Sequence, residues 1–230
     1  MRSLRLLAFA LVLSTSASAL AQQDDDLIPA AQSFLSPERF IVEFHGGPYD
    51  AGDNASIRPF VDDDLGPLLS TNIEYVLLRV PDVLYGSIGG GIGWMQFSGN
   101  ARVASGGVVS EETDLTVIPL SAFAAVRIDA LPRNVHIPFS LGGKLGWQWA
   151  YWSTSTGERD DANGWSLGLL YGLQLILDLD TFEPSAARAM DEEWGINHSY
   201  LFFELMRFDP TDDSLPIGDT YWSVGLGFVF

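Results

Sequence analysis

The carboxyl-terminal segment of the chain alternates between large apolar residues and mainly small ones. In an extended strand, one face of this segment carries Trp222, Val224, Leu226, Phe228 and Phe230. Successive side chains of a β-strand point to opposite faces, so a period of two predicts a strand. An apolar face opposed by small residues predicts lipid on one side of that strand and a crowded barrel interior on the other.

The same alternation recurs along the chain. It is clearest over 165–180, where leucine, tryptophan and tyrosine occupy the odd positions and Ser166, Gly168 and Gln174 lie between them. Six other segments show a similar pattern, at 40–45, 73–77, 84–97, 118–128, 135–152 and 201–205. With the terminal strand they make eight, the even number that a single-chain bacterial barrel with both termini in the periplasm requires. The sequence therefore predicts an all-β fold, an eight-stranded antiparallel up-and-down transmembrane β-barrel over 39–230.

The connection between the predicted sixth and seventh strands departs from this pattern. It is too long for a tight turn and is typical of a short helix that begins at Pro184 and stops at Gly195. One face of this helix carries Ala187, Met190 and Trp194. We expect the helix on the periplasmic side, either as an amphipathic plug or lid at the mouth of the barrel or simply packed beneath it.

Connection lengths indicate the orientation of the barrel. The connections at 80–83 and 130–134 are short, as on the periplasmic side of outer-membrane barrels. Longer connections, expected outside the cell, fall at 46–71, 99–112, 153–163 and 209–218. In this orientation six tryptophans form an aromatic girdle at the extracellular rim: Trp94, Trp147, Trp149, Trp152, Trp165 and Trp222.

The amino terminus predicts export. Arg2 and Arg5 precede an apolar stretch over 6–13, and Ala19-Leu20-Ala21 has the form of a signal-peptidase site. We therefore expect a signal peptide over 1–21, a periplasmic segment over 22–38, and both mature termini in the periplasm. With no cysteine the chain is not a diacylated lipoprotein, and its net charge of -18 argues against nucleic acid as a partner.

Alternation also places charged residues inside the barrel. These predicted lumen charges are Glu43, Glu74, Arg127, Lys144 and Glu204. Unpaired charges in a narrow lumen are costly, so they either pair or are surrounded by water. Since eight strands enclose a space that side chains roughly fill, we expect a plugged interior with pairs such as Lys144 with Glu204 and Arg127 with Glu74, rather than a continuous pore.

Catalytic chemistry finds little support in the residue pattern. The nearest candidate is His198 and Ser199 with Glu204, but adjacent residues on a strand point to opposite faces. Nothing in the spacing singles out a partner for His45, and the three histidines lack metal-ligand spacing. We therefore expect no enzymatic activity, cofactor or metal.

Two segments resemble known outer-membrane proteins. The closing residues match the outer-membrane assembly signal at Ser223, Gly225, Phe228 and Phe230, which implies recognition by the barrel-assembly machinery. The segment EPSAARAMDEEWG followed by INHSYLFFE resembles a family of small outer-membrane β-barrels of myxobacterial type, and the wider architecture is similar to the OmpA transmembrane domain and to OmpW. These resemblances imply contact with outer-membrane lipid and lipopolysaccharide, and leave the oligomeric state open.

Three functions follow as hypotheses. The first is an integral outer-membrane barrel with a structural or surface-exposed role in the envelope. The alternative is a narrow conduit for small hydrophobic molecules, as in OmpW-like barrels. The third is a lipid-modifying enzyme of the outer membrane.

Overall fold

The computed structural model describes residues 38–50, 65–81, 83–102, 108–131, 137–156, 162–211 and 220–230. The predicted signal peptide, and all of the predicted periplasmic segment except its last residue, lie outside the described residues. Among the described residues, no helix combines the length and the hydrophobicity that a transmembrane helix needs.

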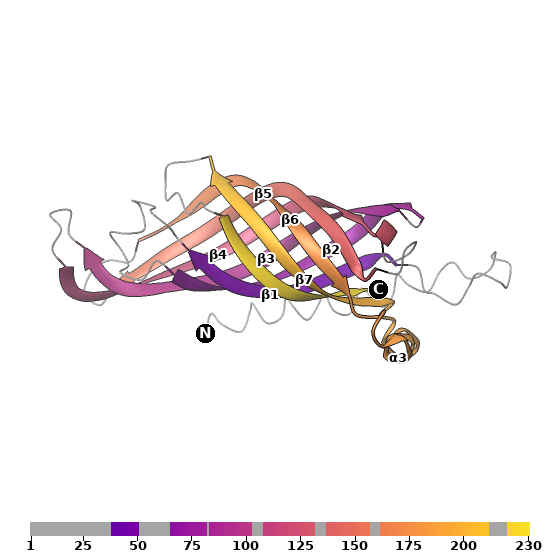
Figure 1. Cartoon of the computed structure of the whole chain (residues 1–230). Helices are drawn as coiled ribbons and strands as arrows, with labels where there is room; N and C mark the ends of the chain where they lie inside the picture. Colours follow the sequence, from indigo (N-terminus) through magenta and orange to yellow (C-terminus); the bar gives the residue numbers. More distant parts are fainter. Residues whose placement is uncertain are drawn as a thin grey trace, which may run out of the picture. The chain divides into compact units, whose positions relative to one another are not determined.

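Eight strands form a closed antiparallel barrel in which each strand pairs with its chain neighbours and β1 pairs with β8 (Figure 1). The strands are β1 (Phe40–Asp50), β2 (Leu65–Val80), β3 (Leu84–Arg102), β4 (Val108–Ile128), β5 (Phe139–Thr156), β6 (Asn163–Asp178), β7 (His198–Pro210) and β8 (Thr220–Val229). A helix, α3 (Pro184–Trp194), lies between β6 and β7. The predicted fold, strand number and helix position are confirmed.

Several strand ends differ from the prediction. β1 continues to Asp50 and β2 begins at Leu65, so the connection between them is shorter than the predicted 46–71. The backbone ladder continues where the hydrophobic alternation stops, with Gly46 opposite Leu69 and Pro48 opposite Pro67. Ladder hydrogen bonds join backbone groups, so glycine continues a strand that the side-chain pattern ends too early. Proline has no N–H to donate, and it fits in the ladder where the two opposed residues are not bonded to each other, as in the pair Pro48 and Pro67.

The barrel has two distinct ends. At one end, the turn end, lie the connection between Val80 and Leu84, helix α3 and the last residue, Phe230. At the other, the loop end, β1, β3, β5 and β7 finish and β2, β4, β6 and β8 begin. Figure 1 shows α3 beside the turn end of the barrel wall.

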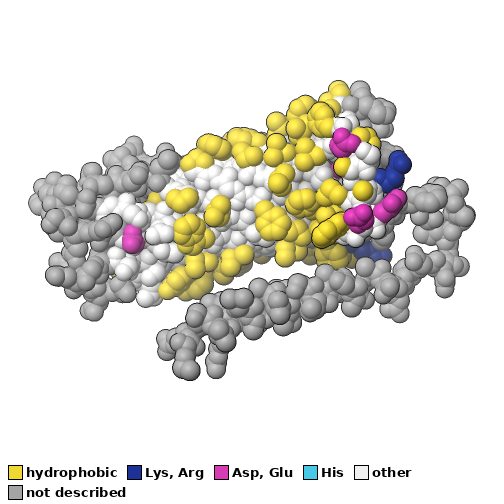
Figure 2. All heavy atoms as spheres, turned by 90° about the horizontal axis from the view of Figure 1, so that it is seen from below, with side chains coloured by type: hydrophobic (Ala, Val, Ile, Leu, Met, Phe, Trp, Pro, Cys, Tyr) yellow, Lys and Arg dark blue, Asp and Glu magenta, His cyan; other side chains and the backbone are white. Residues whose placement is uncertain are grey.

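The outer wall is apolar over most of its height. Outward-facing leucine, isoleucine and aromatic side chains are strongly exposed, including Ile92 at 55%, Leu145 at 59% and Leu173 at 70%. We call this surface the apolar belt. Figure 2 shows hydrophobic side chains spread over one side of the wall, with the acidic and basic side chains gathered toward its ends.

The interior is packed by two hydrophobic clusters. The loop-end cluster comprises Tyr49, Leu68, Met95, Phe97, Leu115, Val117, Ala150, Leu170, Met206, Phe208 and Tyr221. The turn-end cluster comprises Ile41, Ile176, Tyr200, Phe202 and Val229. Inward-facing glycines make room for this packing, because a Cβ at Gly227 would overlap the Tyr200 ring.

Candidate functional site

All five predicted lumen charges are buried inside the barrel. Their exposed fractions are 0% for Glu43, 1% for Glu74, 1% for Arg127, 6% for Lys144 and 2% for Glu204. They come from β1, β2, β4, β5 and β7, each at an inward position of its strand. Between the two hydrophobic clusters they form one group, which we call the ion cluster.

Arg127 binds two carboxylates of the ion cluster. Its Nη1 and Nη2 donate to the two oxygens of Glu74 at 3.0 and 2.8 Å, and Nη2 also donates to Glu43 Oε1 at 2.7 Å. Its Nε donates to Gln174 Oε1 at 3.1 Å. The planar guanidinium suits this two-pronged contact with Glu74, which is stronger than a single charged hydrogen bond.

Lys144 connects the other side of the ion cluster. Its Nζ lies 2.6 Å from Glu43 Oε2 and 3.3 Å from Glu204 Oε2, and it is within 3.9 Å of Glu74 Oε1. The same ammonium lies 5.2 Å from the centre of the Phe123 ring, a distance at which a cation is attracted to an aromatic face. The structure thus brings together both pairs named from the sequence, Lys144 with Glu204 and Arg127 with Glu74.

Glu43 is the centre of the ion cluster, which the sequence pattern did not indicate. Besides the two cations, it accepts hydrogen bonds from Gln174 Nε2 at 2.9 Å, Tyr200 Oη at 2.8 Å and Asn72 Nδ2 at 3.4 Å. The alternation does place the polar residues Asn72 and Gln174 on the inward face, and from this they could have been predicted as partners of the ion cluster. Their convergence on one carboxylate depends on contacts across the barrel, which alternation along one strand does not describe.

His45 extends the network toward β8. Its Nε2 lies 3.2 Å from Asn72 Nδ2 and its Nδ1 lies 2.9 Å from Ser223 Oγ. Because Asn72 Nδ2 can only donate, Nε2 accepts and the proton resides on Nδ1, which donates to Ser223. Both ring nitrogens of His45 are therefore engaged in holding the wall together.

The hydrogen-bonded network draws on every strand. From β1 to β8 its members include Glu43, Glu74, Ser87, Arg127, Lys144, Gln174, Tyr200 and Ser223. Three carboxylates and two cations lie at its centre, so removal of either cation would leave buried negative charge unbalanced.

Little open space remains beside the ion cluster. A cavity of about 30 Å³ is lined by both polar and apolar side chains, among them Asn72, Ser121, Gln148 and Glu204. That volume suits about one water molecule. The loop-end cluster lies on one side of the ion cluster and the turn-end cluster on the other, so buried side chains occupy the lumen at three successive levels.

A second ionic group lies at the turn end, and we call it the turn-end ion group. Glu38 pairs with Arg79 of β2 at 2.5 Å and with His198 Nε2 of β7 at 3.2 Å. Asp180 contacts His198 Nδ1 at 2.7 Å and accepts from Ser199 Oγ at 3.0 Å. Burial raises the pKa of Glu38, but hydrogen bonds and charge attraction from His198 and Arg79 outweigh it and hold that pKa at about 2.

This second group differs from the catalytic arrangement considered in the sequence. The carboxylate beside His198 and Ser199 is Asp180, whereas Glu204 belongs to the ion cluster. Ser199 donates its hydroxyl proton to Asp180, while the two nitrogens of His198 face Asp180 and Glu38. A serine nucleophile needs a base that takes its proton, and His198 is not in that position.

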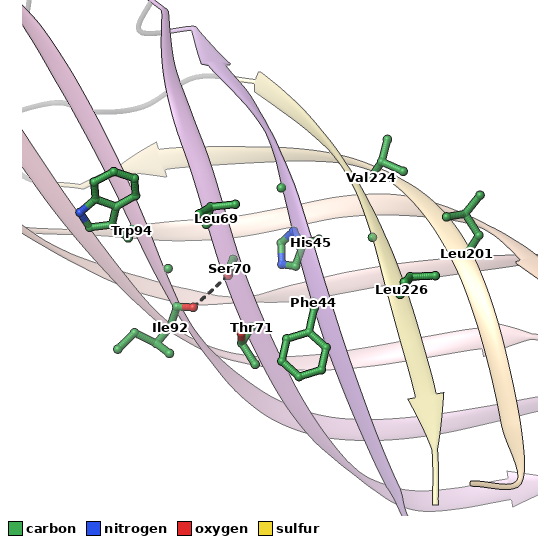
Figure 3. A pocket seen from close by; sticks show the side chains of 13 residues that line it. Phe44, His45, Leu69, Ser70, Thr71, Ile92, Trp94, Leu201, Val224 and Leu226 are labelled. Carbon is green, nitrogen blue, oxygen red and sulfur yellow. Dashed lines mark hydrogen bonds between the residues drawn. The ribbon is translucent and has the colours of Figure 1, made fainter. Parts of the chain in front are cut away.

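The outer wall carries a shallow hollow of about 710 Å³ across β7, β8, β1, β2 and β3. Figure 3 shows its lining, with Phe44, Leu69 and Trp94 among the large side chains around it. Gly46 contributes no side chain, and Ser70 donates its hydroxyl to the backbone oxygen of Ile92 at 3.1 Å, so that this polar group is satisfied. The hollow therefore offers an apolar surface that suits hydrocarbon.

The predicted assembly signal lies along the seam between β8 and β1. Ser223 is fully buried and bonded to His45, and a Cβ at Gly225 would overlap the backbone of Phe44. Phe228 pairs with Val42, and the backbone of Phe230 exchanges hydrogen bonds with Phe40 at 2.8 and 3.0 Å. Recognition of these residues by the assembly machinery stays a prediction.

Five of the six girdle tryptophans are exposed on the outer wall. Their exposed fractions lie between 38% for Trp94 and 54% for Trp165, with Trp147, Trp149 and Trp222 between these values. Trp152 does not belong with them, because it shares the inward face of β5 with Lys144 and packs against the loop-end cluster. Which side of a membrane the outward tryptophans face stays a prediction.

No protein-family model and no curated protein matches the chain. Among solved structures, the attachment invasion locus protein Ail of Yersinia pestis, in complex with the heparin analogue sucrose octasulfate, is similar over 84% of this chain and 97% of its own, with 12% identity and a TM-score of 0.45. The outer membrane protein OprG of Pseudomonas aeruginosa is similar over 84% and 96%, with 14% identity and a TM-score of 0.45. The outer membrane protease OmpT of Escherichia coli is similar over 73% and 64%, with 13% identity and a TM-score of 0.35. At such identities and scores the function has to be argued from this chain's own residues.

Proposed function

We propose that this chain is an integral β-barrel of the bacterial outer membrane, with a structural or surface-exposed role and without catalysis. Its apolar belt contacts outer-membrane lipid and lipopolysaccharide, and both ends of the mature chain lie in the periplasm after removal of the signal peptide. The barrel-assembly machinery inserts it by way of the β8 residues described above. The observation that carries this proposal is the exposed apolar belt around a barrel whose interior is already filled.

The apolar belt supports a lipid environment. Leucine, isoleucine and aromatic side chains cover the outward face of every strand, whereas a soluble monomer rarely exposes a contiguous apolar patch of more than a few hundred Å². Charged and polar groups are placed inside or toward the ends. Such an inversion of the usual pattern is stable only where hydrocarbon surrounds the wall.

The filled interior supports a structural role over transport. The loop-end cluster, the ion cluster and the turn-end cluster succeed one another along the axis. A solute would have to displace buried charges that depend on one another for balance, which costs far more than opening a solvated channel.

A depth comparison on the outer wall tests the membrane location. Leu173→Arg places a charge in the apolar belt and should destabilise the folded barrel in lipid vesicles by about 2 to 4 kcal/mol. Ser155→Arg, on the outward face near the loop end, should cost about 0 to 1 kcal/mol. Equal costs in urea unfolding would contradict a lipid environment for the belt.

Conductance in planar bilayers tests the closed interior. We expect no stable single-channel steps from the purified, refolded protein, with a known porin as the positive control. Reproducible steps whose ion selectivity changes in Lys144→Ala would overturn the structural role. Passage of small apolar solutes into proteoliposomes, without such steps, would favour the narrow hydrophobic conduit instead.

A further inference from the structure

Helix α3 exposes the most accessible large hydrophobic side chain of the described residues. Trp194, at its last position, is 73% exposed, and Phe182, just before the helix, is 63% exposed. No residue of α3 is buried, so the helix does not insert into the mouth of the barrel as a plug. Large aromatic side chains in this state indicate a surface that something else covers.

The helix is amphipathic. Ala187, Met190 and Trp194 fall on one face, at helical spacing, whereas Glu192 falls on the opposite face and Glu193 lies to one side. Ala187 and Met190 are partly shielded from solvent, whereas Trp194, on the same face, is exposed. The apolar face therefore continues past the barrel wall that supports it.

The end of the helix holds Trp194 in a defined place. Gly195 adopts a left-handed conformation with φ of 67°, and its N–H donates to Asp191 O at 3.0 Å. The next N–H, of Ile196, donates to Met190 O at 3.2 Å, which completes a common helix-ending motif. Two residues later the chain enters β7 at His198, which is bound to Asp180 and Glu38.

The position of α3 relates its apolar face to the apolar belt. The helix contacts β7, whose outward side chains Leu201 and Phe203 are part of the belt near the turn end. Figure 1 shows the helix beside the wall at that end. Tryptophan at the end of a lipid-facing wall is typical of the level of the lipid headgroups. Phenylalanine joins tryptophan on the apolar face of amphipathic helices that lie in that region.

We propose that the apolar face of α3, together with Phe182, binds the headgroup region of the periplasmic leaflet and fixes the depth of the barrel in the bilayer. This inference rests on the proposed membrane location. The helix carries Arg188 against Asp191, Glu192 and Glu193, so its net charge is negative. Binding therefore depends on insertion of apolar side chains and not on attraction to anionic lipid.

Single-cysteine labelling of the full chain tests this directly, because the natural sequence contains no cysteine. Trp194→Cys reports the apolar face, Glu192→Cys reports the opposite face of the same helix turn, and Leu173→Cys reports the belt. Each variant is labelled with an environment-sensitive fluorophore and folded into phosphatidylcholine vesicles. Quenching by headgroup-attached nitroxide lipid is then compared with quenching by iodide in the water.

We expect the label at 194 to be quenched severalfold more by the nitroxide lipid than the label at 192, with the order reversed for iodide. Adding anionic lipid should leave this ratio unchanged. Preferential iodide quenching at 194, with the belt label at 173 protected from iodide, would overturn the inference while leaving the membrane location intact. Shielding of 194 from both quenchers would also overturn it and indicate a protein contact, whereas iodide access at 173 would show that the membrane location itself is wrong.

Discussion

The ion cluster and the turn-end ion group both pair glutamate with basic side chains, but they differ in how deeply those side chains are buried. In the ion cluster the side chains of Glu43, Arg127 and Lys144 are at most 3% exposed. In the turn-end ion group the side chains of Arg79 and His198 are each 31% exposed. Each charge in the interior requires its partners, because water cannot replace them, whereas water can replace a lost partner at the rim. Burial, rather than the number of contacts, therefore decides how much each group matters to stability.

Removal of Lys144 should produce the largest effect. Lys144→Ala leaves Glu204 without its cation and deprives Glu43 of one of two, so we expect a loss of about 3 to 5 kcal/mol in the free energy of unfolding. Urea titration of the barrel in detergent micelles, followed by the heat-modifiable gel shift, measures this. The double variant Lys144→Ala, Glu204→Gln should recover part of the loss. A neutral single variant would mean that water reaches the ion cluster.

Arg127→Lys should have the next largest effect, although it conserves the charge. An ammonium cannot reproduce the two-pronged contact with Glu74 together with the bonds to Glu43 and Gln174. We expect a loss of about 2 kcal/mol, in line with charged hydrogen bonds that are lost in the interior. The same substitution at Arg79, in the turn-end ion group, is the matched control and should cost well under half as much in the same titration.

Glu38→Gln should have a smaller and salt-dependent effect. The partly exposed pairs with Arg79 and His198 are screened by ions, so we expect a loss of about 1 kcal/mol at low ionic strength that shrinks near 1 M salt. The cost of Lys144→Ala should change little over the same range, because the ion cluster is out of reach of solvent ions. Parallel salt dependence of the two variants would contradict the difference in burial.

The smallest effect concerns pH and involves Glu38 alone. Its pKa of about 2 lies below the ordinary value of 4.5, so its carboxylate stabilises the fold above pH 4.5. That contribution should be lost as the pH falls from 4.5 toward 2. Glu38→Gln should remove this part of the pH dependence, which the urea midpoints of both proteins between about pH 5 and pH 2 would show. An unchanged slope in the variant would assign the pH dependence to other groups.

Alternation along single strands was sufficient to predict the barrel and the inward side of its charges. Each of Glu43, Glu74 and Arg127 has a side fixed by its parity within a strand, and parity needs no knowledge of the rest of the chain. The central position of Glu43 was not predictable in this way, because it depends on which residues meet across the lumen. Register between strands and the tilt of a closed barrel decide those meetings.

Two smaller differences have equally physical origins. Trp152 was grouped with the rim tryptophans by its height along β5, although its parity places it inside. Asp180 was overlooked as a partner of His198 because the alternation was followed to residue 180, whereas β6 ends at Asp178 and Asp180 lies in the turn beyond it. The alternation of side chains predicts which way a residue faces within a strand, but it gives no prediction for residues beyond the end of the strand.

The network of contributions from all eight strands has a mechanical consequence for the barrel. A closed sheet with an empty centre can flatten into an ellipse when the lateral pressure of a surrounding bilayer changes. Here Arg127 and Lys144 connect opposite sides of the ring through Glu43, so that flattening would stretch several charged bonds at once. The cross-section of the barrel should therefore stay round, and the barrel should respond to changes in bilayer thickness by tilting as a rigid body.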